Sequence, residues 1–296
     1  MDTAVTERDH HKTAVEDVQG RAVSIQAAAA TSSALKKLNE LFAGGDMTAV
    51  LAEADRVLAE DPNLGGAHYL RAVALWKLGR PGDAVASIRR AEELIPDQPG
   101  IDGVTGTILM DLGDQEKKAG SEEKARAAWT EAAEAFGRTL VKSPNDTSAL
   151  TNRVIALDRA GKVDETIGAL TALLAADPGN AKASLRLAEV ESDAGRLDDA
   201  LAVLDRMPDP NVDTVLALYN VSVKLYNAKK LAPILPAMQK AIRIAPEIPH
   251  PHQLLSRVLL NQGDVPGAVR ELKEFLRLAP DDPDAASERE MLKAIE

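Results

Sequence analysis

Residues 65–96 read GGAHYLRAVALWKLGRPGDAVASIRRAEELIP, and this stretch decides the fold of the chain. Its two apolar halves are separated by Gly79, and it closes at Pro96. The glycine belongs to a series with a period of 34 residues, interrupted once, that passes through Gly45, Gly79, Gly113, Gly161, Gly195, Lys229 and Gly263. Internal repeats of this length indicate one helix-turn-helix unit copied along a solenoid.

Two further positions of the period support this interpretation. A residue of modest size follows five positions later in Val50, Ala84, Thr166, Ala200, Ile234 and Ala268. Proline follows seventeen positions later in Pro62, Pro96, Pro178, Pro246 and Pro280. Glycine ends a helix with little strain because it can adopt the left-handed conformation, and the residue before a proline avoids the α region. Each unit is therefore predicted to be a helix, a glycine turn and a second helix that stops near a proline.

The composition favours an all-α chain and narrows the function classes. Aromatic residues are 3% of the 296 residues, whereas hydrophobic residues are 45%, which suits close packing of helices. The chain has no cysteine, which excludes disulfides and thiolate metal sites. A formal net charge of −11 argues against general nucleic-acid binding, since phosphate neutralisation needs a basic face.

The sequence also predicts the cellular location of the protein. No stretch approaches the roughly 20 consecutive apolar residues of a membrane helix, so we expect no membrane insertion. The N-terminus carries Glu7, Asp9, Glu16 and Asp17 where a signal peptide would need a basic start followed by an apolar run. We therefore expect a cytoplasmic protein.

Seven hairpin units are expected, at residues 31–62, 65–96, 99–144, 147–178, 181–210, 215–246 and 249–280. Residues 281–296 are predicted to form a C-terminal capping helix, because the end of an array needs a polar outer face. In the fifth unit, Pro208 and Pro210 are expected to end the second helix about one turn early. Residues 1–30 stand outside the period and form either a helix, which caps the first unit or pairs with another chain, or a partly disordered polar leader.

The third unit carries 14 extra residues, at about 114–127. Adding about seven residues to each helix lengthens both by about two turns and preserves the register of the hairpin. The residues of this insertion are mostly charged, so it is either a solvated extension or a docking knob for a partner.

The repeats resemble the tetratricopeptide repeat family. In the second unit Ala72, Leu75, Gly79, Ala84, Ile88, Ala91 and Pro96 stand in the phases of the family pattern, and in the seventh Leu255, Ser256, Leu259, Gly263, Ala268 and Pro280 do so. The resemblance covers about residues 31–280 and implies a right-handed α-α superhelix that binds peptides or partner proteins along the face of its first helices.

Aromatic residues are candidates for apolar contacts on that face. Five of the eight aromatics fall in phases expected to be exposed there: Phe42, Tyr69, Trp76, Tyr219 and Tyr226. Large, rigid side chains suit peptide recognition because they contribute contact area at a low entropic cost. The alternative is that these phases carry aromatics for packing alone.

Polar residues supply a second group of candidates. Asn152, Lys182 and Arg186 resemble three members of the carboxylate clamp of co-chaperones in the family, although Gly103 and Thr107 occupy the other two positions. Asn152 and Asn220 also resemble two rungs of the asparagine ladder in O-GlcNAc transferase repeats, which grips a peptide backbone. The alternative for Lys182 and Arg186 is ordinary solvated charge, offset by acidic residues on the following turn.

No catalytic, cofactor or metal site is expected. The sequence lacks phosphate-binding loops, dinucleotide-binding loops and zinc-binding helices of the known patterns. His250 and His252 flank Pro251 and are expected to lie in a loop before the last unit.

The sequence therefore predicts a non-catalytic adaptor or scaffold that binds a partner protein or peptide. Two alternatives stay open: a regulatory subunit that recruits a separate enzyme, such as a glycosyltransferase or oxygenase, and a structural protein that self-assembles into homo-oligomers through its N-terminal segment.

Overall fold

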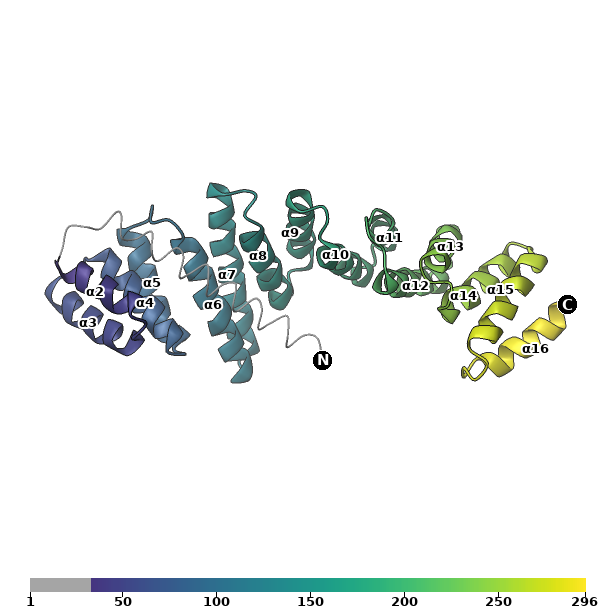
Figure 1. Ribbon diagram of the computed structural model, residues 1–296, viewed down its shortest axis with the longest axis horizontal. Helices are drawn as coiled ribbons and strands as arrows, with labels where there is room; N and C mark the ends of the chain where they lie inside the picture. The colour runs from purple at the N-terminus through teal and green to yellow at the C-terminus, as the bar shows by residue number, and fades with distance from the viewer. Residues whose placement is uncertain (1–32) are drawn as a thin grey trace. The chain divides into compact units, whose positions relative to one another are not determined.

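The computed structural model describes residues 33–296, and over that range the chain consists of α-helices joined by turns. It divides into two compact units between Ala169 and Leu170 (Figure 1). The predicted N-terminal segment, residues 1–30, lies outside the described residues.

The first unit stacks helical hairpins in chain order. Its helices are α2 (Ser33–Ala43), α3 (Met47–Glu60), α4 (Gly65–Lys77), α5 (Pro81–Leu94), α6 (Ile101–Lys118), α7 (Glu122–Lys142) and α8 (Thr147–Ala160), followed by α9 (Val163–Ala176), which begins in this unit. Small residues on the second helices let the backbones approach closely: Ala84 and Ala91 of α5 are completely buried against α4 and its neighbours, together with the larger Ile88.

The second unit repeats the same arrangement. Its helices are α10 (Ala181–Asp193), α11 (Leu197–Asp205), α12 (Val212–Asn227), α13 (Ile234–Ile244), α14 (Pro249–Asn261), α15 (Val265–Leu278) and α16 (Ala285–Ile295). Helix α11 has 9 residues, compared with 14 in α15, and it ends before Pro208. Helix α16 packs against α15, with Ala285 and Glu288 buried.

The turns between paired helices explain the glycine period. Gly45, Gly79, Gly161, Gly195 and Gly263 all have φ between 73° and 82°, in the left-handed region. At the equivalent position Lys229 has φ 60°, which a lysine adopts at a steric cost. Its amide still donates to the carbonyl of Tyr226, as the turn requires. The period therefore marks the place of the turn even where glycine is absent.

The long hairpin α6–α7 departs from this rule. Gly113 stands in phase with the other glycines but lies inside α6, and the left-handed residue comes seven positions later, at Gly120. A Cβ atom on Gly113 would lie 2.3 Å from Nε1 of Trp129, so this glycine makes room for the indole ring of α7. The two helices have 18 and 21 residues, compared with 13 and 14 in α4 and α5.

The expectation of a loop at His250 and His252 is wrong. Both residues lie in the first turn of α14, which begins at Pro249. Prolines are tolerated there because the first amides of a helix have no intrahelical acceptor. The right-handed superhelical path of the whole array stays a prediction.

Candidate partner-binding surface

An apolar stripe runs along α12 in the second unit. Its members alternate at spacings of four and three residues, which places them on one flank of the helix. They are Val212, Leu216, Tyr219, Val223 and Tyr226. Val212 and Leu216 are 46% and 47% exposed, and among the described residues no other helix carries two large apolar side chains exposed to this degree. We call these five residues the α12 stripe.

The neighbouring helix α14 borders the stripe. The rings of Tyr219 and His250 lie 5.7 Å apart between centroids, and His250 in turn lies edge-on to Phe275 at 6.2 Å. Tyr219, Val223 and Tyr226 also pack against the core of the unit, so their inner sides are fixed and their outer sides border solvent. Burial, together with Asp284 and Asp282, raises the pKa of Tyr219 in spite of the opposing charge of Arg257. The phenol is therefore a neutral hydrogen-bonding group.

A network of charged and polar residues joins α14 to the start of α16. Nη2 of Arg257 donates to Oε1 of Glu288 at 2.5 Å and lies 3.7 Å from Oδ2 of Asp284. Burial alone would lower the pKa of Arg257, but the hydrogen bond and charge of Glu288, with Asp284, raise it overall. Nε2 of Gln253 also donates to Oε1 of Glu288, at 2.8 Å. This network fixes the capping helix α16 against α14.

His252 fixes the N-terminal turn of α14 through its two ring nitrogens. It is 5% exposed, its Nδ1 lies 2.7 Å from Oε2 of Glu271, and its Nε2 lies 3.2 Å from the carbonyl oxygen of Pro246. Both partners are acceptors, so both bonds form when the imidazole carries two protons. Burial lowers the pKa of His252, but Glu271, the Pro246 carbonyl and Glu274 outweigh it and raise the pKa overall. His252 thus joins α14 to α15 and to the preceding turn, and the raised pKa favours its charged form.

The predicted polar residues of the second unit lie on first helices of the hairpins. Lys182 is exposed on α10, and Arg186 is half-buried one turn later, where its Nη1 donates to Oε2 of Glu189 at 2.6 Å. Asn220 is exposed on α12. Asn152 is half-buried on α8 in the first unit. The clamp of Asn152, Lys182 and Arg186 stays a prediction.

The aromatic candidates of the first unit occupy the core. Tyr69 is 0% exposed and Trp76 is 5% exposed, so the expectation that they stand on an exposed face is wrong. Helix α6 of the next hairpin explains the burial of Trp76, because Asp111 on that helix accepts the indole N–H at 2.6 Å. Phe42 is half-buried against the same core cluster. Packing therefore accounts for Tyr69 and Trp76, whereas the partner-binding role of the half-buried Phe42 stays a prediction.

Sequence reasoning missed Val212, Leu216, His250 and Arg257. The spacing of the apolar residues along 212–226 could have revealed the first two, because alternation by four and three defines one helix flank. His250 was missed because the sequence predicts a loop there. Arg257 was missed because its position depends on contacts with α16, which no local sequence pattern encodes.

Within residues 33–296, no group of three or more His, Asp or Glu side chains is arranged to hold a metal ion. Over the same range, none of the helices combines the length and apolar character that crossing a membrane requires.

Comparison with known proteins identifies the repeats. Sequence models of the tetratricopeptide repeat family match residues 35–99, which include α3, α4 and α5, and residues 159–220. The chain is a tetratricopeptide repeat (TPR) protein. Among curated proteins, none matches the chain.

Solved structures share the fold of this TPR protein. A structure of Naa15/Naa10 bound to HypK-THB matches with a TM-score of 0.60 at 15% identity, over 89% of this chain. The TPR protein spans 39% of the length of that chain. MamA matches with a TM-score of 0.44 at 22% identity over 62% of this chain and 96% of MamA. A tetratricopeptide repeat protein from Parabacteroides merdae matches with a TM-score of 0.39 at 16% identity, over 89% of this chain and 99% of that one.

Proposed function

We propose that this TPR protein is a non-catalytic adaptor that binds an amphipathic helix of a partner protein along the α12 stripe. The observation that carries the proposal is the pair of exposed apolar side chains, Val212 and Leu216, in line with half-buried Tyr219, Val223 and Tyr226. Complete burial of a fully exposed leucine or valine contributes about 1.5–3 kcal/mol, and roughly half of that is available from each of these partly exposed side chains. Alternation by four and three residues is also the spacing at which one helix meets another.

Polar residues of the same unit would fix the orientation of the bound partner helix. Asn220 is on α12 itself, and Lys182 and Arg186 are on α10, so we propose that they bind the polar edge of the partner helix. Asn152 remains a candidate in the first unit. Among the aromatics, we assign Tyr219 and Tyr226 to the apolar contact, whereas the buried Tyr69 and Trp76 serve packing. A cytoplasmic location remains part of the proposal.

The test compares two matched variants. Leu216→Asp places a charge in the α12 stripe, and Val141→Asp places the same charge on α7, where Val141 is 83% exposed. Neither side chain is in a core, so both variants should keep the circular dichroism spectrum of the wild type. Partners captured from a lysate and quantified by mass spectrometry should then include a protein that Leu216→Asp loses and Val141→Asp retains. A partner set that is the same for all three proteins would refute the proposal.

A further inference from the structure

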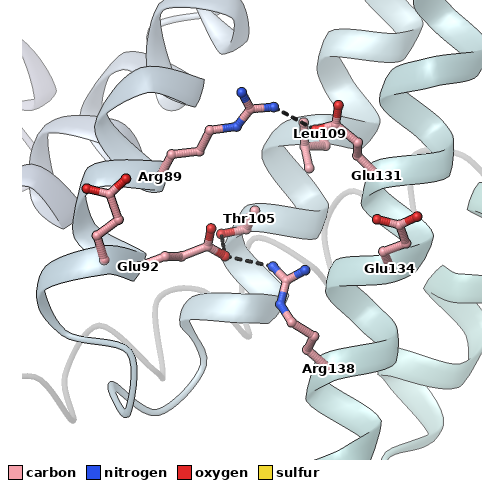
Figure 2. Close-up of a pocket in the computed structure, with 8 residues that line it drawn as sticks. Arg89, Glu92, Thr105, Leu109, Glu131, Glu134 and Arg138 are labelled. Atoms are coloured by element: carbon pink, nitrogen blue, oxygen red, sulfur yellow. Dashed lines mark hydrogen bonds and ion pairs between the residues drawn. The ribbon is translucent and has the colours of Figure 1, made fainter.

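The first unit contains a pocket on the side of the second helices. Its volume is about 650 Å³, and it lies between α5 and α7 with α6 between them. Figure 2 shows side chains entering from α5 on one side and from α7 on the other, with Thr105 and Leu109 of α6 between them. Thr105 and Leu109 are 3% and 4% exposed, so α6 forms a closed floor. None of the residues predicted from the sequence lines this pocket.

Two ion pairs bridge the pocket. Nη2 of Arg89 on α5 lies 2.7 Å from Oε2 of Glu131 on α7, and Nη2 of Arg138 on α7 lies 2.8 Å from Oε1 of Glu92 on α5 (Figure 2). Thr105 also donates to Oε1 of Glu92, at 2.9 Å. The bridges run in opposite directions between the same two helices, so each one links the two walls of the pocket across α6.

The arginines of the pocket are already neutralised. Arg138 donates a second bond, from Nε to Oδ1 of Asp102 at 2.8 Å, and so contacts two carboxylates. The glutamates are in excess: the lining holds Glu92, Glu93, Glu131 and Glu134 against two arginines. Glu93 lies 2.6 Å from Arg90, whereas Glu134 makes no ion pair with any described residue. Figure 2 places Glu134 on α7 between the two bridges.

We propose that this pocket binds a lysine or arginine side chain presented by a partner protein. The ammonium or guanidinium group would pair with Glu134, and the alkyl part of the side chain would lie along Leu109, as long basic side chains do when their stems cover apolar surface. An anionic ligand fits less well, because Arg89 and Arg138 would have to exchange the carboxylates they hold and the whole chain carries a net charge of −11. The site belongs to the first unit and is additional to the α12 stripe of the second.

The test uses a basic peptide probe and a matched pair of variants. The probe is a fluorescein-labelled peptide of alternating arginine and glycine, and its control has glutamine in place of each arginine. Glu134→Gln removes the unpaired carboxylate of the pocket. Glu123→Gln removes an exposed carboxylate of the same helix outside the pocket, so both variants change the net charge equally.

Fluorescence anisotropy at low ionic strength should show that the wild type and Glu123→Gln bind the basic peptide equally. Glu134→Gln should bind it about five-fold more weakly, which corresponds to about 1 kcal/mol for a partly exposed ion pair. Binding should weaken as salt is added, because the contact is electrostatic. The proposal is overturned if the wild type does not bind the peptide, if both variants bind it alike, or if the glutamine peptide binds as well.

Discussion

Replacing His252 by glutamine should destabilise the second unit, and the loss should be larger at pH 6 than at pH 8.5. The imidazole is 5% exposed and contacts two acceptors, the carboxylate of Glu271 at 2.7 Å and the carbonyl of Pro246 at 3.2 Å. A hydrogen bond to a charged group contributes about 1.5–3 kcal/mol. Glutamine has a neutral NH2 group at one end only, so it can donate to one of these two acceptors and presents a carbonyl oxygen to the other. We therefore expect a loss of about 2 kcal/mol at pH 6.

The pH dependence follows from the raised pKa of His252, in which Glu271, the Pro246 carbonyl and Glu274 outweigh the effect of burial. A group whose pKa is higher in the folded state stabilises the fold fully below its unfolded pKa, near 6.5 for histidine. That contribution is lost as the pH rises through the folded pKa. The wild type should therefore lose stability between pH 6 and pH 8.5, while the variant, which has no titrating group at this position, should lose less.

Hydrogen exchange is the appropriate assay. Both tryptophans, Trp76 and Trp129, belong to the first unit, so their fluorescence does not report on α14. Peptides from α14 and α15 should exchange faster in His252→Gln than in the wild type, and the difference should shrink at pH 8.5 after correction for the intrinsic rate. A difference of equal size at both pH values would refute the doubly protonated imidazole.

Three glycine substitutions, one of them a control, test the turns and the long hairpin. Gly113→Ala should lower the free energy of unfolding by about 1–2 kcal/mol, because overpacking against Trp129 outweighs the higher helix propensity of alanine, and tryptophan fluorescence in urea would measure the change. Gly168→Ala, where no neighbouring atom lies within 4 Å of the added Cβ, should instead be neutral or stabilising; equal losses in both would contradict the packing argument. Lys229→Gly should stabilise the second unit by roughly 1 kcal/mol, since φ 60° costs a lysine more than a glycine, and an unchanged urea midpoint by circular dichroism would count against strain at this turn.

The sequence predicted the hairpins well because their signals are local. A glycine that can turn left-handed and a proline that ends a helix act within a few residues, so the period located turns even at Lys229. The prediction of a loop at His250 and His252 was wrong for a local reason too. Proline breaks a helix in its interior but is tolerated in its first turn, where these residues lie.

Exposure was harder to predict than secondary structure. Trp76 and Tyr219 stand on first helices in related phases, yet Trp76 is covered by α6 and bonded to Asp111, whereas Tyr219 lies half-buried beside His250. The difference depends on the side chains of the next hairpin, which the repeat pattern does not specify. The pocket between α5 and α7 was not predicted for the same reason. Its ion pairs join residues that are far apart in the sequence: Arg89 and Glu131 are separated by 42 positions, and Glu92 and Arg138 by 46.

The displaced turn of the long hairpin shows how this architecture accommodates extra residues. Moving the turn from the phase of Gly113 to Gly120 extends the C-terminal end of α6 by seven residues, which is nearly two whole turns at 3.6 residues per turn. An added segment of that size leaves the apolar face of each helix pointing the same way. A single extra residue would rotate everything beyond it by about 100° and expose the buried face. The lengths at which both helices keep their buried faces toward the neighbouring hairpins are therefore discrete, and about seven added residues per helix is one of them.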